Sequence, residues 1–199
     1  NEWLLSGHAA ALDGLKTTPD ADPACLSCHS SDYVFTARLI EEVNAGTRVG
    51  PAPAPTTLET ARFGVTCVGC HNPHQEKTET TPDFSLVAEP YTLCTSCHSD
   101  NVVTPGLHHP VKEMFEGTKL FEDIEGQPSK HFTDENGAKC VDCHMADVPV
   151  ENGAFSLATH TDKPVLPATN IEGLVDVCTT CHTDVTANAM EKFVTDSQE

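Results

Sequence analysis

The sequence predicts a mostly irregular fold with a few short α-helices and minimal β-structure. Three observations lead to this expectation. All ten cysteines lie in five copies of the motif Cys-x-x-Cys-His, which are spread along the whole chain. Large apolar side chains are scarce, since 38% of the residues are hydrophobic and only 6% are aromatic. Strand patterns between the motifs are weak, and loops rich in Gly, Pro, Thr and Asp dominate there.

The five motifs are the attachment signature of c-type haem. In this signature two thiols bond covalently to the porphyrin edge, and the adjacent imidazole ligates the iron. Zinc ribbons, thioredoxin-like sites and disulfide scaffolds also pair cysteines, but none requires a histidine directly after the second cysteine. The predicted haem-attaching cysteines are Cys25, Cys28, Cys67, Cys70, Cys94, Cys97, Cys140, Cys143, Cys178 and Cys181. The predicted iron ligands within the motifs are His29, His71, His98, His144 and His182.

Five haem c groups would replace much of a conventional core, because each porphyrin offers more apolar area than a tryptophan side chain. The chain supplies only about 40 residues per motif, which is too few for independent domains. We therefore expect a single domain over residues 1–199, and an apo chain that does not fold stably.

The apolar pattern predicts four helices, at residues 2–16, 33–43, 111–121 and 184–194. Gly7 weakens the first of these helices, and Gly46 is expected to end the second. Residues 50–56 predict an extended, polyproline-like spacer. The best strand candidate is residues 155–159.

The formal net charge of −19 excludes nucleic acid and anionic membrane surfaces as partners. The negative charge remains compatible with a basic partner, a bound cation or a neutral surface. The sequence holds no apolar run of the roughly 20 residues that a membrane span requires. The chain starts at Asn1, which suits an exported protein whose signal peptide has been removed.

Six histidines lie outside the motifs, and five irons each need a second axial ligand if all are six-coordinate. The number of these histidines is close to the number of second axial positions, which favours bis-histidine ligation of all five irons. The candidates are His8, His74, His108, His109, His131 and His160. His74 follows His71 too closely to bind the other face of the same haem, so we expect it to reach a neighbouring one.

Two questions about the second ligands stay open in the sequence. His108 and His109 either serve two different haems, or one of them only supports a ligand. Successive side chains of an extended segment point to opposite faces, which permits the first arrangement. Methionine could replace one histidine and raise the reduction potential of that haem. The candidates for such a ligand are Met114, Met145 and Met190.

The stretches around the motifs, such as residues 22–29, 64–71 and 139–145, resemble those of small multihaem c-type cytochromes. In length and haem count, the chain is similar to the pentahaem electron donor of periplasmic nitrite reduction. In haem density and irregular loops, it is similar to the subunits of extracellular cytochrome filaments. The resemblance implies a multihaem cytochrome c wrapped around a chain of five stacked haems. It also implies thioether bonds at each motif cysteine, a proximal ligand at each motif histidine, and a periplasmic or extracellular location.

Electron transfer is the function that these features predict, because six-coordinate irons cannot bind a substrate. The sequence favours a subunit of an extracellular filament, with redox proteins as partners and His8 as a candidate ligand to an adjacent subunit. A discrete periplasmic shuttle to a reductase is the alternative. A reductase with an open haem is less favoured, since the Cys-x-x-Cys-Lys motif of related nitrite reductases does not occur. We therefore expect no catalytic residues.

Overall fold

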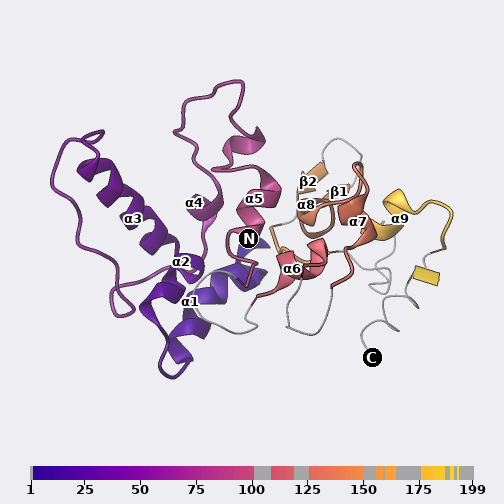
Figure 1. The fold of residues 1–199 in the computed structure, drawn as a ribbon, viewed down its shortest axis with the longest axis horizontal. Coiled ribbons are helices and arrows are strands. Elements are labelled where there is room, and N and C mark those ends of the chain that lie inside the picture. The colour runs from indigo at the N-terminus through magenta and orange to yellow at the C-terminus, as the bar shows by residue number, and fades with distance from the viewer. Residues whose placement is uncertain are drawn as a thin grey trace. The chain divides into compact units, whose positions relative to one another are not determined.

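The computed structural model describes residues 2–100, 109–118, 126–149, 156–158, 160–164, 176–186, 189–190 and 192. The chain forms two compact units. We call Trp3–Ser129 the N-terminal unit, and residues 1–2 with Lys130–Glu199 the C-terminal unit. Short helices joined by irregular backbone make up the described parts of both (Figure 1), which confirms the predicted fold class. The expectation of a single domain stays a prediction.

The N-terminal unit carries six α-helices within its described residues: α1 (Gly7–Thr17), α2 (Leu26–His29), α3 (Ser31–Asn44), α4 (Cys67–Cys70), α5 (Pro90–Thr95) and α6 (Val111–Glu116). The 3₁₀ turns η2 (Pro23–Cys25) and η3 (Asp83–Ser85) lie between them, and η1 (Glu2–Leu5) precedes α1. Three of these helices, α2, α4 and α5, contain motif cysteines.

The first predicted helix is divided in two. Residues 2–5 form the turn η1, and Ser6 then caps α1 by accepting a hydrogen bond from the Ala9 amide at 3.3 Å. A serine favours this position because its side chain can satisfy an amide that lacks a helical partner. Leu12 and Leu15 of α1 are buried, whereas Leu4 of η1 is 61% exposed.

Helix α3 confirms the second predicted helix and extends it at its N-terminal end. Ser30 caps it by accepting a hydrogen bond from the Tyr33 amide at 3.4 Å. After α3, Gly46 adopts a left-handed conformation, with φ of 71°, and the chain turns. Residues 51–55 of the predicted spacer are exposed and form neither helix nor strand. The spacer returns to α3 where the Thr56 hydroxyl donates to Thr36 Oγ1 at 3.1 Å.

Helix α6 begins where the sequence predicts but is shorter. It ends at Glu116, because Gly117 takes the left-handed conformation with φ of 70° and donates its amide to the Glu113 carbonyl. A left-handed glycine satisfies the last carbonyls of a helix and stops it. The predicted helix over residues 111–121 is therefore wrong at residues 117–118, and residues 119–121 lie outside the described residues.

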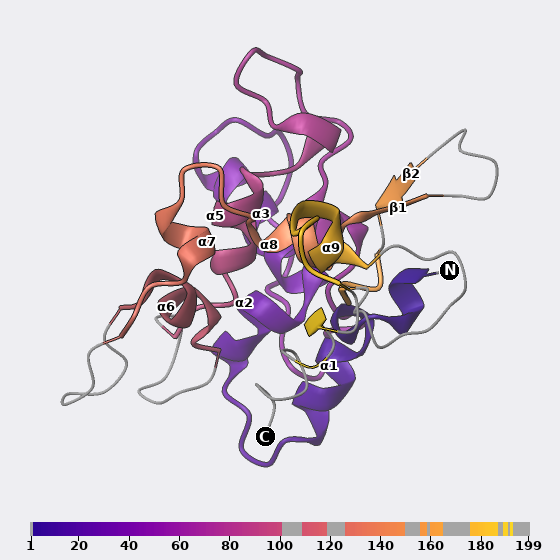
Figure 2. The ribbon, with the colours of Figure 1, turned by 90° about the vertical axis from the view of Figure 1, so that its right-hand side faces the viewer.

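The C-terminal unit holds α7 (Lys130–Thr133), α8 (Cys140–His144), β1 (Asp147–Pro149), β2 (Ser156–Ala158) and α9 (Val177–Cys181). Strands β1 and β2 pair antiparallel, with Val148 opposite Leu157 (Figure 2). Strand β2 falls within the predicted strand 155–159. Of the predicted helix 184–194, residues 184–186 form a turn and bend, residues 189, 190 and 192 are helical, and the others lie outside the described residues.

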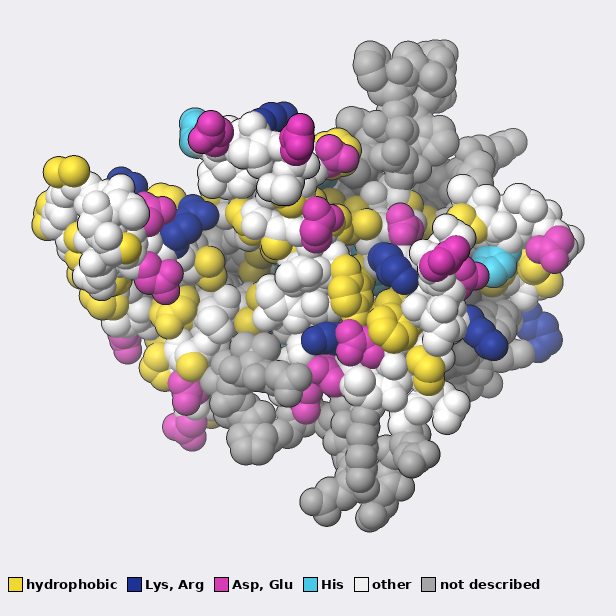
Figure 3. Space-filling view, turned by 45° about the horizontal axis from the view of Figure 1, so that its top comes forward, with side chains coloured by type: hydrophobic (Ala, Val, Ile, Leu, Met, Phe, Trp, Pro, Cys, Tyr) yellow, Lys and Arg dark blue, Asp and Glu magenta, His cyan; other side chains and the backbone are white. Residues whose placement is uncertain are grey.

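The described residues bury only four hydrophobic side chains, those of Leu12, Leu15, Leu26 and Ala61. Leu26 is fully buried between α1 and α3. Large apolar side chains are instead exposed, and Figure 3 shows them among acidic residues at the surface. Phe84, for example, is 85% exposed. So small a core agrees with the expectation that bound cofactors supply apolar contacts. None of the described helices is long and apolar enough to cross a membrane.

Candidate haem-binding sites

Each motif forms a short helical turn that gathers its reactive groups on one side. The amide of the motif histidine donates to the carbonyl of the first motif cysteine, as in His71 to Cys67 at 2.7 Å and His182 to Cys178 at 2.8 Å. Residues three and four apart lie on one face of a helix. Both thiols and the imidazole of a motif therefore share a face, as attachment of one porphyrin requires.

Local hydrogen bonds hold these turns in place. The carboxylate of Asp176 caps α9, accepting from the amides of Cys178 at 2.9 Å and Thr179 at 2.8 Å. Burial alone would raise the pKa of Asp176, but the hydrogen bonds from Thr179 and the backbone lower it below its usual range. Asp142 likewise accepts from the Lys139 amide at 2.7 Å at the start of α8. Acidic caps therefore fix the motif turns of the C-terminal unit.

Three motif histidines are oriented by backbone carbonyls through Nδ1. His29 Nδ1 lies 3.0 Å from Ala11 O, His71 Nδ1 lies 2.9 Å from Phe84 O, and His144 Nδ1 lies 2.9 Å from Asp162 O. A carbonyl only accepts, so Nδ1 carries the proton and the ring lone pair lies on Nε2. Metal-bound histidines commonly make this contact, which fixes the ring and raises its basicity. The motif histidines thus fit iron ligation through Nε2.

Small and apolar residues of α1 lie beside the first motif. A depression of about 300 Å³ is lined by Cys25 and His29 of the motif and by Ala10, Ala11, Gly14, Leu15, Thr18 and Ala21. This lining is mostly apolar, as contact with a porphyrin face requires. The residues present therefore fit a haem attached at Cys25 and Cys28.

Four histidines form a chain of ring contacts in the N-terminal unit. His29 and His109 have ring centroids 6.2 Å apart, His109 and His98 are 5.8 Å apart, and His98 and His8 are 5.9 Å apart. Imidazole nitrogens bind first-row metals at about 2 Å, so two rings on opposite sides of one iron have centroids about 6 Å apart. Each neighbouring pair in the chain therefore has the spacing of two axial ligands.

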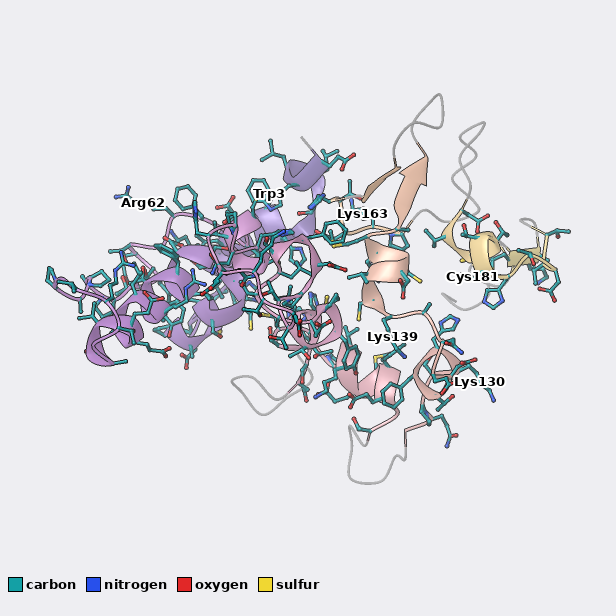
Figure 4. The ribbon with its side chains drawn as sticks, turned by 90° about the horizontal axis from the view of Figure 1, so that it is seen from above. Trp3, Arg62, Lys130, Lys139, Lys163 and Cys181 are labelled. Atoms are coloured by element: carbon teal, nitrogen blue, oxygen red, sulfur yellow. The ribbon has the colours of Figure 1, made fainter. Side chains whose placement is uncertain are left out.

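A similar pair lies in the C-terminal unit. His131 of α7 and His182 after α9 have ring centroids 6.1 Å apart. Lys139 lies at the same place, donating from Nζ to the His131 carbonyl at 3.0 Å and standing over the Phe132 ring at 5.9 Å. Lys130 is the first residue of α7, and Lys139 lies near this helix (Figure 4). A ligand-like pair is thus accompanied by cationic side chains in a chain that is acidic as a whole.

Cysteine contacts show which motifs are neighbours. The thiols of Cys28 and Cys97 interact with each other, which raises the pKa of Cys28 and lowers that of Cys97. In the C-terminal unit, burial and then the nearby Cys178 thiol raise the pKa of Cys143. All ten cysteines are free, so none is used in a disulfide. Motif one therefore adjoins motif three, and motif four adjoins motif five.

The structure brings three of the six non-motif histidines beside motif histidines: His8, His109 and His131. His108 lies outside the described residues. His74 is exposed in the turn after motif two, and no described residue makes a ring contact or hydrogen bond with its side chain. His160 lies in a turn where its amide donates to the Glu2 carboxylate at 3.3 Å.

Of the methionines considered as ligands, Met114 is 64% exposed and thus points into solvent, whereas Met145 and Met190 are half-buried. Sequence reasoning missed Glu113, a buried acidic residue in the first turn of α6. An acidic residue in the first turn of a helix is ordinary, and only its burial distinguishes it.

Comparison with known proteins agrees with these sites. The family model for a doubled CXXCH motif matches residues 61–103, which include motifs two and three. No curated protein matches the chain at a significant level.

Two solved structures are similar to the chain. The outer cell wall cytochrome OcwA is 30% identical, with a TM-score of 0.68 over 97% of this chain. The undecahaem cytochrome from the S-layer of Carboxydothermus ferrireducens is 26% identical, with a TM-score of 0.61 over 95%. The chain spans 36% and 31% of the lengths of these two proteins. The motifs, the histidine geometry and these likenesses together identify the chain as a multihaem c-type cytochrome.

Proposed function

We propose that the chain transfers electrons through five covalently attached c-type haems with mostly bis-histidine, low-spin iron. The observation that carries this proposal is the set of histidine pairs with the ring spacing of axial ligands. Haem iron, when bound, cycles between its ferric and ferrous states. The residues of the chain would occupy both axial positions, exclude substrates from the iron and set its potential.

The histidine chain of the N-terminal unit supports one assignment of ligands. His29 and His98 belong to different motifs, so each must bind its own haem. His29 contacts only His109 within the four-residue chain, which leaves His8 for His98. The contact between His109 and His98 then joins ligands of two different haems. We assign His29 with His109 to the first haem, and His98 with His8 to the third.

The pair His131 and His182 gives the fifth haem two axial ligands under the same reasoning. For the second and fourth haems, the proximal ligands His71 and His144 are proposed from the motifs, and His74, His108 and His160 remain as candidates for the second position. This arrangement assigns no catalytic role to any residue, so we propose a conductor of electrons and not an enzyme.

Motif contacts support conduction between haems. The Cys28–Cys97 contact would join the attached edges of the first and third haems, and the approach of Cys143 to Cys178 would do the same for the fourth and fifth. Electrons would therefore pass directly between motif one and motif three. The order of haems along the electron path would differ from their order in the sequence.

We place this function outside the cytoplasmic membrane, because one structural relative is an outer cell wall cytochrome and the other is a cytochrome from an S-layer. Polymerisation into an extracellular filament, with redox proteins as terminal partners, is the assembly that we propose. The position of His8 beside His98 favours a role for His8 within its own chain, so a ligand to an adjacent subunit would come from another histidine, such as exposed His74. Monodisperse small particles in negative-stain micrographs would refute the filament and favour a discrete shuttle.

The test of the electron-transfer proposal uses the haem-loaded protein. A pyridine haemochrome assay and intact mass should give five haems, and electron paramagnetic resonance (EPR) should show low-spin ferric iron with no high-spin signal. His8→Ala and His109→Ala should each convert one haem of the five to high spin, and the double variant should convert two. A resting high-spin haem that binds cyanide in the unmodified protein would instead indicate a reductase.

A further inference from the structure

Glu113 is a buried carboxylate in the first turn of α6. Its side chain is 8% exposed, and among the described residues only Asp176 is a comparably buried acid. Ser99 Oγ donates to Glu113 Oε1 at 2.6 Å, and the Asp100 amide donates to Oε2 at 3.1 Å. Burial would raise the pKa of Glu113, but these hydrogen bonds, and Lys112 to a smaller extent, lower it below its usual range. The carboxylate is therefore ionised at neutral pH.

The partners of Glu113 belong to the two segments that carry His98 and His109. Ser99 and Asp100 follow His98 directly, while α6 begins two residues after His109. The backbone joins the same segments, because the Lys112 amide donates to the His98 carbonyl at 3.0 Å. The rings of His98 and His109 lie 5.8 Å apart at this junction. The carboxylate therefore fastens together the segments that carry ligands of two haems.

A fixed negative charge in a poorly solvated place acts strongly on a nearby redox centre. It stabilises the ferric iron, which carries one more positive charge than the ferrous iron. Lys112 is adjacent but partly solvated, so water screens its opposing effect.

We propose that Glu113 is a positioning residue for His98 and His109, and that its buried charge lowers the reduction potentials of the first and third haems. This inference rests on the proposed ligand pairs.

The test is an EPR-monitored redox titration of the haem-loaded Glu113→Gln variant. Glutamine keeps the size of the side chain, and its amide can bond to both Ser99 and the Asp100 amide. At a fixed potential, the ratio of ferric to ferrous iron should fall about tenfold for two haems, which is a positive shift of about 59 mV for a one-electron couple. Glu41→Gln removes the same charge from the exposed far end of α3 and should leave all five haems unchanged.

Ser99→Ala provides a change of opposite sign. It keeps the charge of Glu113 but removes the shorter of its two hydrogen bonds, so the less compensated carboxylate should raise the ferric fraction of the same two haems. A general structural disturbance would shift both variants in one direction. Unchanged potentials in both variants, or equal shifts in Glu113→Gln and Glu41→Gln, would overturn the inference. Five low-spin haems in the unmodified protein, measured first, keep the proposed function separate from this outcome.

Discussion

Gly64 is the position where one added methyl group should displace an iron ligand. It lies in the segment before motif two, packed against the first turn of α1. A Cβ atom at this position would lie 2.7 Å from the carbonyl oxygens of both His8 and Ala9. Ordinary carbon–oxygen contacts are no shorter than about 3.3 Å, so the two backbones must separate by about 0.6 Å in Gly64→Ala.

The energetic cost follows from the contacts at this junction. Overpacking costs about 1–3 kcal/mol. The hydrogen bond from the Val65 amide to the His8 carbonyl, now 3.0 Å, would be lengthened at a cost of about 1 kcal/mol. Alanine restricts the unfolded chain and returns about 0.4–1 kcal/mol. We expect a net destabilisation of about 2 kcal/mol, together with movement of His8 away from His98.

Two measurements check this expectation. The guanidinium midpoint, followed by the Soret absorbance, should fall, and EPR should show one high-spin haem of five. Gly7→Ala is the matched control, because Gly7 precedes His8 directly and no atom lies within 4 Å of its added Cβ. The control should keep or slightly raise the midpoint, since alanine favours a helix over glycine by about 1 kcal/mol. Equal midpoints and spectra for the two variants would refute the steric reasoning.

Three further predictions concern other parts of the chain. His131→Met should keep a six-coordinate haem at His182 but raise its reduction potential, as spectroelectrochemistry would show; an unchanged potential in all haems would contradict that pair. Leu26→Ala should lower the free energy of unfolding by about 3 kcal/mol because the side chain is fully buried, whereas the exposed Leu4→Ala should change it little; similar values would argue against the small core. The pKa of Asp176 is lower in the folded state than in the unfolded state. Its contribution to the free energy of unfolding is therefore present above the unfolded-state pKa and is lost as pH falls through the folded-state pKa. Asp176→Asn should therefore reduce the acid sensitivity of unfolding below about pH 4, with denaturation curves at several pH values as the measurement.

Local signals in the sequence were sufficient for the motifs and, to within two residues, for the starts of α3 and α6. The Cys-x-x-Cys-His motif spans only one helical turn, so its local structure depends on adjacent residues. The apolar pattern of residues 33–43 predicts α3 for the same reason, because residues close in sequence determine this helix. The apolar pattern did not predict the break at Ser6. A serine side chain can cap a new helix or lie within a continuous one, and this single residue determines which occurs. Gly117 shortened α6 through its left-handed conformation, which the apolar pattern does not report.

Ligand partners were beyond the sequence for a different reason. His8 and His98, or His29 and His109, meet only when distant segments pack together, and no local pattern encodes that meeting. Counting histidines could establish that enough ligands exist but not which ring lies opposite which. The burial of Glu113 likewise depends on Ser99 and Asp100 from another segment.

The histidine chain also bears on how the protein is made. With the proposed pairs, His8 leaves the ribosome first yet waits for His98, and His29 waits for His109. Neither the first nor the third haem can complete its coordination until most of the N-terminal unit has been synthesised and exported. Haem attachment at the first motif would therefore precede its final ligation, and a partly assembled chain would carry a temporarily reactive iron. Bringing such distant segments together is also a slow step in folding.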